Sequence, residues 1–250
     1  MRRSVSVLLL LASLVSAAAV ALPHQPTELT GIDEYRRAET LVYSEHGSTA
    51  EIRALLEEVR RKLRSESNLA FRSYWIARTH LLMATHHNQQ DDSRSAQQQV
   101  ESGFAAIEDA LSRGGEFSEG LRVQADLHAQ MMFARGMIYI ARYGNEARRQ
   151  ALRAMELDPG NAGARITVAG FYLNAPGIAG GDTEKGTAIL ESTLEQHAVN
   201  ESERFLILGL LAETYTDAGD TARATHYVRR AEEIYPNSPW LTELRSAAGS

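Results

Sequence analysis

The chain has 250 residues and is acidic, with 26 lysines and arginines against 32 aspartates and glutamates and a net charge of −6. This balance argues against a nucleic-acid partner, because binding to phosphates needs clustered positive charge. The sequence contains no cysteine. We therefore expect neither a disulfide framework nor a lipid-attachment cysteine, and stability has to come from packing.

The first 21 residues have the composition of a secretory signal. Arg2 and Arg3 precede an apolar run over residues 5–15, and small residues lead up to Ala21. The apolar run is too short to span a bilayer comfortably, so we expect cleavage after Ala21 and a mature protein that is exported, periplasmic or secreted, and not membrane-embedded. An uncleaved anchor is the alternative. Cleavage removes two of the 26 basic residues and takes the net charge from −6 to −8.

The rest of the chain favours one helical domain. Residues 22–31 contain two prolines and little that could pack, which predicts a flexible leader. Residues 32–250 show helical periodicity almost throughout and no convincing strand alternation, which predicts an all-α domain. We expect turns where the periodicity is interrupted, at residues 47–48, 88–95, 114–115, 144–145 and 174–182.

A first helical hairpin is predicted around the polar stretch 88–95. This stretch resembles a solvated loop, and the segments on either side, 71–87 and 96–111, have helical periodicity. An aromatic helix followed by a helix rich in small residues is the arrangement of a degenerate repeat.

A looser hairpin is predicted over residues 128–161. Ala147 and Ala154 provide the small residues of its second helix, and the turn is expected at residues 144–145. Arg135 occupies a position where a small residue is usual, so this copy departs from the repeat pattern.

A third hairpin is predicted over residues 163–200, with Gly170 and Gly186 at small-residue positions. It fits the repeat only if about four residues are inserted in its turn. The insertion, 174–182, is too rich in glycine and proline for a helix and too apolar for an ordinary solvated turn. Asp182 is expected to cap the next helix, where it would compete with a bound anion for the same amides. The structural residues of the insertion are Pro176, Gly177, Gly180, Gly181 and Asp182.

The clearest hairpin covers residues 205–238. Its turn is predicted at Gly219, which tolerates a positive φ, and Asp220, which caps the second helix. Ser238 and Pro239 open one further helix, whose inner face is Trp240, Leu241 and Leu244. The spacing of small, aromatic and turn residues matches the roughly 34-residue tetratricopeptide repeat. The matching residues are Leu208, Leu211, Ala212, Tyr215, Ala224, Val228, Ala231 and Pro236.

Several motifs resemble those of exported bacterial tetratricopeptide repeat proteins. They are Trp-Ile-Ala-Arg at 75–78, Glu-Asp-Ala-Leu at 108–111, Asp-Pro-Gly-Asn at 158–161 and the glycine-rich insertion. The layout is also similar to that of the T component of tripartite (TRAP) solute transporters. The first resemblance implies an antiparallel helix-hairpin solenoid. The second implies a cavity for an apolar ligand and docking on a solute-binding partner, but the usual lipid anchor is missing.

In this repeat class, the first helix of each pair lines a concave binding surface. The inner positions of the better-aligned copies combine aromatic and methionine side chains, which give large contact areas, with carboxylates. The alternative is that Met132, Tyr139 and Phe171 simply pack helix against helix. Arg135, Arg142 and Arg165 could line the same groove or form surface pairs. The predicted groove residues are Met132, Tyr139, Thr167, Phe171, Asn174, Glu213, Thr216 and Asp217.

No motif indicates catalysis, a metal or a cofactor. His80, His86 and His87 do not have the i, i+4 spacing that places two imidazoles on one metal, and residues 177–185 lack the ending of a phosphate loop. The sequence therefore predicts a non-catalytic binding or scaffold protein that engages a protein segment. The alternative is an accessory transporter subunit that binds a small apolar ligand; a hydrolase or metalloenzyme is the third hypothesis.

Overall fold

A computed structural model of the protein describes residues 30–236 and 238–248. The predicted signal, 1–21, and all but the last two residues of the predicted leader lie outside these ranges. Within them the chain is all-α, with no strand. The helices are α1 (Ile32–Tyr43), α2 (Thr49–Lys62), η1 (Leu63–Ser65), α3 (Leu69–Gln89), α4 (Ser93–Gly114), α5 (Ser118–Arg135), α6 (Met137–Leu157), α7 (Ala162–Asn174), η2 (Gly177–Ala179), α8 (Thr183–Gln196), α9 (Glu201–Asp217), α10 (Thr221–Glu232) and α11 (Pro239–Ala248).

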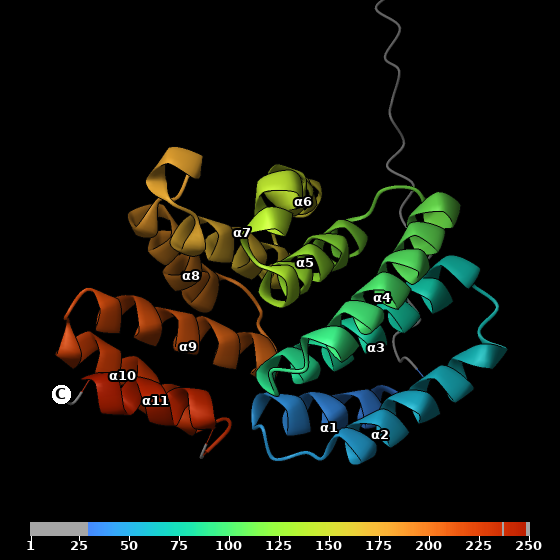
Figure 1. The fold of residues 1–250 in the computed structure, drawn as a ribbon, viewed down its shortest axis with the longest axis horizontal. Coiled ribbons are helices and arrows are strands. Elements are labelled where there is room, and N and C mark those ends of the chain that lie inside the picture. The colour runs from blue at the N-terminus through green and yellow to red at the C-terminus, as the bar shows by residue number, and fades with distance from the viewer. Residues whose placement is uncertain (1–29, 237, 249–250) are drawn as a thin grey trace, which may run out of the picture.

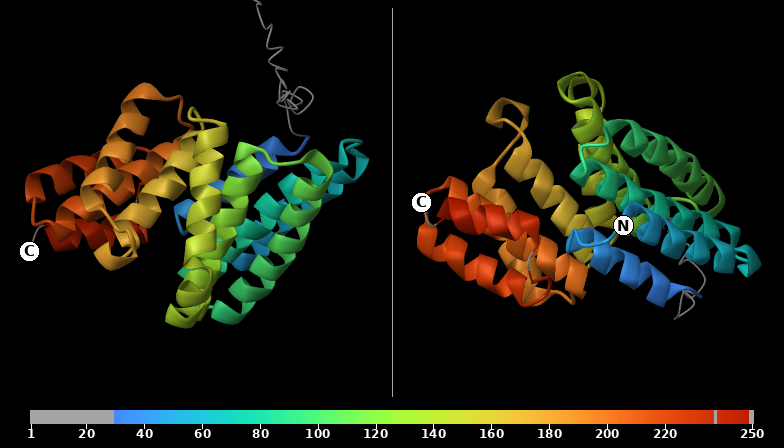
Figure 2. Two further views of the ribbon diagram at one scale, coloured as in Figure 1. Left: turned by 90° about the horizontal axis from the view of Figure 1, so that it is seen from above. Right: turned by 60° about the horizontal axis from the view of Figure 1, so that its bottom comes forward.

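Neighbouring helices pack in pairs (Figure 1). The pairs are α1 with α2, α3 with α4, α5 with α6, α7 with α8, and α9 with α10, and α11 packs on the last pair. The first helix of each pair also contacts the first helix of the next pair, and α1 contacts α9. The first helices of the five pairs are α1, α3, α5, α7 and α9, and we call them the inner helices. They form a closed row, as the views in Figures 1 and 2 show.

Aromatic side chains close this row. The ring centroid of Tyr43, at the end of α1, lies 6.1 Å from that of Phe205 and 6.3 Å from that of Tyr235. Phe205 also contacts Trp240 of α11, with ring centroids 5.7 Å apart. The first pair of helices is thus joined to the last pair by an apolar contact between residues far apart in the sequence.

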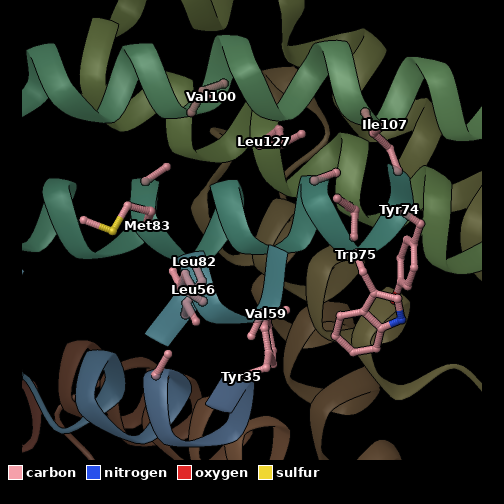
Figure 3. Close-up of a cluster of buried hydrophobic side chains, with 14 of the residues drawn as sticks. Tyr35, Leu56, Val59, Tyr74, Trp75, Leu82, Met83, Val100, Ile107 and Leu127 are labelled. Atoms are coloured by element: carbon pink, nitrogen blue, oxygen red, sulfur yellow. The ribbon is translucent and has the colours of Figure 1, made fainter. Parts of the chain in front are cut away.

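The largest core cluster belongs to α1–α6. Tyr35, Leu56, Trp75 and Leu82 come from the first three α-helices, and Leu127 of α5 closes the cluster from the other side (Figure 3). Smaller clusters join α7, α8 and α9, and α9, α10 and α11. Packing is therefore continuous along the chain, as the absence of cysteine from the sequence requires.

The predicted details of the clearest hairpin are confirmed. Gly219 has a φ of 71° in the turn between α9 and α10, and Asp220 Oδ1 accepts a hydrogen bond of 3.0 Å from the amide of Arg223. Helix α11 begins at Pro239 and buries Leu241 against the same hairpin. The hairpin predicted around residues 88–95 is also confirmed, as α3 and α4 joined by a short turn.

The turn predicted at residues 144–145 is wrong. These residues lie inside α6, and the hairpin turns at Gly136, whose φ is 67°. Glycine adopts this conformation without the penalty that a Cβ would bring, whereas a glycine inside a helix costs only about 1 kcal/mol relative to alanine. The Gly-Asn pair was therefore a weaker turn signal than Gly136. The predicted copy 128–161 accordingly belongs to a hairpin whose turn comes eight residues earlier than expected.

The insertion after α7 forms an ordered turn that contains η2. The amide of Asp182 donates to the carbonyl of Tyr172 (2.9 Å), and the amide of Gly181 donates to that of Pro176 (3.1 Å). Asp182 Oδ1 accepts from the amide of Lys185 at 3.0 Å, so it caps α8. Gly180 has a φ of 89°. These bonds hold a closed loop, from which Ile178 projects fully exposed.

Two glycines of this loop provide a matched test of its packing. A Cβ on Gly181 would overlap the carbonyl oxygen of Ala175, whereas a Cβ on Gly177 would meet nothing within 4 Å. We expect Gly181→Ala to lower the free energy of unfolding by about 1 to 3 kcal/mol, because the backbone has to move. Urea unfolding measures this change. Gly177→Ala is the control and leaves stability nearly unchanged; equal losses in the two variants would contradict the packing described.

Candidate functional site

Helix α5 presents three charged residues on its inner face. Glu119, Arg122 and Asp126 stand at spacings of three and four, which places them on one side of a helix. Arg122 donates to both oxygens of Glu119, with Nε–Oε1 and Nη2–Oε2 distances of 2.9 Å. Its Nη1 donates to Asp126 Oδ2 at 2.5 Å. One guanidinium therefore holds two carboxylates.

The network continues onto α3 and α1. The Tyr74 hydroxyl donates to Glu119 Oε2 at 2.7 Å and accepts a long hydrogen bond, 3.4 Å, from Arg78. Arg78 Nη2 lies 3.4 Å from Glu39 Oε1. The Arg78 guanidinium is also 4.6 Å from the centroid of the Trp75 ring, a cation–π distance. Arg78 thus links the acidic side chain of α1 to the cluster on α5.

Helix α7 completes the network from the other side. Thr167 Oγ1 donates to Asp126 Oδ1 at 2.7 Å, and Asn161 Nδ2 donates to Glu119 Oε1 at 2.8 Å. Asn161 also caps α7, because its Oδ1 accepts from the amide of Ala164. Four inner helices therefore share this set of hydrogen bonds. Its charged members, which we call the inner charge network, are Glu39, Arg78, Glu119, Arg122 and Asp126.

These side chains form a polar wall that still contacts solvent. The exposed fractions of the side chains are 20% for Arg78, 12% for Arg122 and 27% for Glu119. They are 15% for Glu39 and 23% for Asp126. Each group is enclosed by helices but is not sealed in a dry core, so a bound molecule could reach it.

The carboxylates of the network are unequally neutralised. Burial opposes ionisation of Glu119, but the ion pair and hydrogen bonds with Arg122 outweigh burial and hold its pKa well below the usual range. Burial raises the pKa of Asp126 despite the attraction of Arg122. Burial likewise raises the pKa of Glu39 despite Arg78. The two arginines therefore do not fully offset the burial of Asp126 and Glu39.

Helix α9 carries two more acidic groups on an exposed face. One face of α9 packs on α7 and α8 through Leu211, and another packs on α10 and α11 through Ala212. Glu213 and Asp217 lie on the remaining, exposed face. Neighbouring atoms shield Glu213 in part from water, and this partial desolvation, followed by the Asp217 charge, raises its pKa. The two predicted groove carboxylates thus stand together on an inner helix.

Helix α7 leaves open space beside Thr167. A Cβ on Gly170 would meet nothing within 4 Å. Asn174, one turn further, donates from Nδ2 to the carbonyl of Gly170 at 2.8 Å and is exposed. This face of α7 therefore carries small and polar residues and leaves open space beside the helix.

Other predicted groove residues pack between helices. Met132 belongs to α5 and Tyr139 to α6, so the two do not share a helix as predicted. Tyr139 is buried and its hydroxyl lies 2.8 Å from His128 Nδ1. Met132 packs on the large core cluster, and Phe171 packs on the cluster between α5, α6 and α7. Met132, Tyr139 and Phe171 thus all pack helix against helix, which was the alternative interpretation of these residues.

The remaining polar candidates have local partners. Thr216 Oγ1 donates to the carbonyl of Ala212 at 2.8 Å. Arg165 donates to Ser192 and Thr193 of α8, and Arg142 lies over the ring of Tyr143. Arg135 is exposed at the end of α5.

Sequence reasoning missed the five charged residues of the inner network. The available signal was the Glu-x-x-Arg-x-x-x-Asp spacing over 119–126, which places both carboxylates within reach of one arginine on a helix. The predicted hairpin begins at residue 128, in the middle of α5. The residues of α5 before 128 were therefore not assigned to an inner helix. No local pattern indicates that Arg78 meets Glu39, since 39 residues separate them.

The histidines of α3 take part in separate contacts. His86 Nε2 lies 2.9 Å from Thr49 Oγ1, and His87 Nδ1 lies 3.3 Å from Asp92 Oδ2. His80 Nδ1 lies 2.8 Å from Gln99 Oε1; burial, with the Arg60 charge, lowers its pKa to about 4. Over residues 30–236 and 238–248, no three His, Asp or Glu side chains gather as a metal site would need.

Comparison with known proteins adds no further information about the site. No protein-family model matches the chain, and no curated protein matches it. In the part of the chain that the structure describes, no helix is both long enough and apolar enough to cross a bilayer.

Proposed function

We propose that this chain is an exported, non-catalytic binding protein with tetratricopeptide-like repeats, which engages a lysine- or arginine-bearing protein segment along its inner helices. The signal-like sequence over residues 1–21 supports export, to the periplasm or beyond. The packing of helices in neighbouring pairs, with the first helix of each pair on the inner row, is compatible with such repeats.

The acidic balance of the inner charge network supports this choice of partner. Its two arginines pair with three carboxylates, Glu39, Glu119 and Asp126, and α9 carries two further carboxylates, Glu213 and Asp217. Three of the five, Glu39, Asp126 and Glu213, have a raised pKa for which burial is the largest cause. A cationic side chain of a partner would stabilise the ionised form of each, so complementarity favours a basic segment.

The same wall is unsuited to a small apolar ligand. Such a ligand would displace water from charged groups without replacing their hydrogen bonds, which costs free energy. A peptide offers backbone amides, carbonyls and cationic side chains in their place. The inner charge network therefore favours a protein segment over the transporter-accessory alternative.

Short labelled peptides of matched length and opposite charge test this proposal by fluorescence anisotropy. We expect saturable, salt-sensitive binding of the basic peptide and none of the acidic one. The double variant Glu213→Gln/Asp217→Asn is expected to weaken binding by about three- to tenfold, because exposed charges each contribute modestly. Glu195→Gln, an exposed glutamate of the outer helix α8, is the control.

Equal losses in the Glu195→Gln control would indicate a general charge effect and contradict binding on the inner row. Tighter binding of the acidic peptide would contradict the proposed partner chemistry.

A further inference from the structure

The ordered insertion holds an arginine of a neighbouring outer helix. The guanidinium of Arg148, on α6, lies against the insertion, with Nη1 3.1 Å from the point where a Cβ on Gly180 would stand. A side chain at Gly180 would therefore press on this guanidinium. The positive φ of 89° at Gly180 is a second reason for glycine there. The loop and α6 together fix one cation.

A second cation converges on the same place from α8. Lys185 Nζ lies 4.4 Å from the ring centroid of Tyr172, which is on α7. Lys185 foremost, and Arg148 in addition, lower the pKa of the Tyr172 hydroxyl, although burial opposes the shift. Both cations therefore act on one phenol oxygen, and like charges brought together in this way repel each other.

A third cation lines a pocket beside them. The pocket has a volume of about 260 Å³ and is lined by Asn145, Arg148, Arg149 and Leu152, which stand on one face of α6. Among the described residues, no ion pair is made by Arg148, Arg149 or Lys185. Arg153, one turn along the same helix, differs because it pairs with Glu116 and Glu156.

The three cations beside this pocket have no carboxylate partner among the described residues to balance their charge. An anion in the pocket would relieve the repulsion between Arg148 and Lys185. Guanidinium groups bind phosphate oxygens through paired, charge-assisted hydrogen bonds, and Asn145 can add a neutral donor.

We propose that this pocket binds a phosphate group, held by Arg148, Arg149 and Lys185. The group belongs either to a soluble phosphorylated small molecule or to the headgroup of an anionic phospholipid, since both present the same oxygens. The amides at the start of α8 are not part of the site, because Asp182 already accepts the hydrogen bond from Lys185 N. The site lies on outer helices and is independent of peptide binding on the inner row.

Calorimetric titration of the purified chain with inorganic phosphate, in a chloride buffer, tests the proposal. We expect saturable binding that weakens at least about tenfold in Arg148→Gln/Arg149→Gln, which removes both guanidinium contacts. The matched control is Arg142→Gln, an exposed arginine of the same helix that does not line the pocket. Circular dichroism verifies that the variants keep their helices. Lys185→Met is expected to weaken binding as well and provides a second, independent variant.

Two further measurements identify the source of the phosphate. Binding of glycerol 3-phosphate without sedimentation on vesicles indicates a soluble ligand. Co-sedimentation with vesicles that contain phosphatidic acid, but not with pure phosphatidylcholine vesicles, indicates a lipid headgroup if Arg148→Gln/Arg149→Gln abolishes it. Absence of saturable phosphate binding, or an equal loss in Arg142→Gln, overturns the proposal.

Discussion

Replacing Arg122 with methionine is expected to lower the free energy of unfolding by about 3 to 5 kcal/mol at pH 7. The variant keeps most of the side-chain volume but leaves Glu119 and Asp126 without the guanidinium that holds both. Two carboxylates then face each other in an enclosed site with no cation between them. Chemical denaturation of the wild type and the variant at one pH measures the difference.

The pH dependence of this loss identifies its cause. The wild-type pKa of Glu119 is lowered, so its contribution to stability is present above its unfolded pKa and is lost as pH falls through the lower folded value. In the variant, unpaired carboxylates have raised pKa values in the folded state, and they gain stabilising protons as pH falls. The difference in the free energy of unfolding between wild type and variant is therefore largest near neutral pH and becomes smaller in acid. A difference that does not change with pH would indicate lost packing instead.

An exposed ion pair provides the control for Arg122. Arg113 pairs with Asp109 on α4, but the two side chains are 47% and 39% exposed. We expect Arg113→Met to leave stability almost unchanged, because water screens an exposed pair and solvates the partner that remains. A loss as large as that of Arg122→Met would contradict the view that enclosure by the inner helices makes the network sensitive.

The sequence predicted the parts of the fold that depend on local rules. Gly219 and Asp220 indicated the turn between α9 and α10 because a left-handed glycine and an N-cap are determined by a few neighbouring residues. The same reasoning failed at residues 144–145, where packing of α6 tolerates a glycine inside the helix. Contact between α1 and α9 was not predicted, since it depends on how small angles between successive pairs add up along the chain.

Some of the residues predicted for the groove lie on inner helices, and others do not. Glu213 and Asp217, from the best-aligned copy, lie on the inner row, and Thr167 reaches the inner charge network. Met132 and Tyr139 were assigned to one helix, although Gly136 separates α5 from α6. Because the predicted register was wrong, the predicted orientation of these two side chains was wrong as well. The Arg78–Glu39 ion pair joins two helix pairs, and one sequence carries no signal for such a contact.

Truncation of Phe205 to alanine is expected to destabilise the protein by about 3 to 5 kcal/mol, the usual cost of emptying a buried aromatic site. Phe205 is 1% exposed and contacts the rings of Tyr43, Tyr235 and Trp240, which come from both ends of the described chain. Its removal therefore takes away packing at the point where α1 meets α9. Urea unfolding measures the loss of stability.

Hydrogen exchange of α1 distinguishes loss of closure from a general loss of packing. In Phe205→Ala the amides of α1 are expected to exchange faster than those of α3 and α4, because α1 loses an apolar partner on α9 while the α3–α4 pair keeps its own. Phe133→Ala is the matched control: this phenylalanine is 76% exposed, and its truncation is expected to change stability by no more than about 0.5 kcal/mol. Unchanged protection of α1 in Phe205→Ala would mean that the closed row does not depend on this contact.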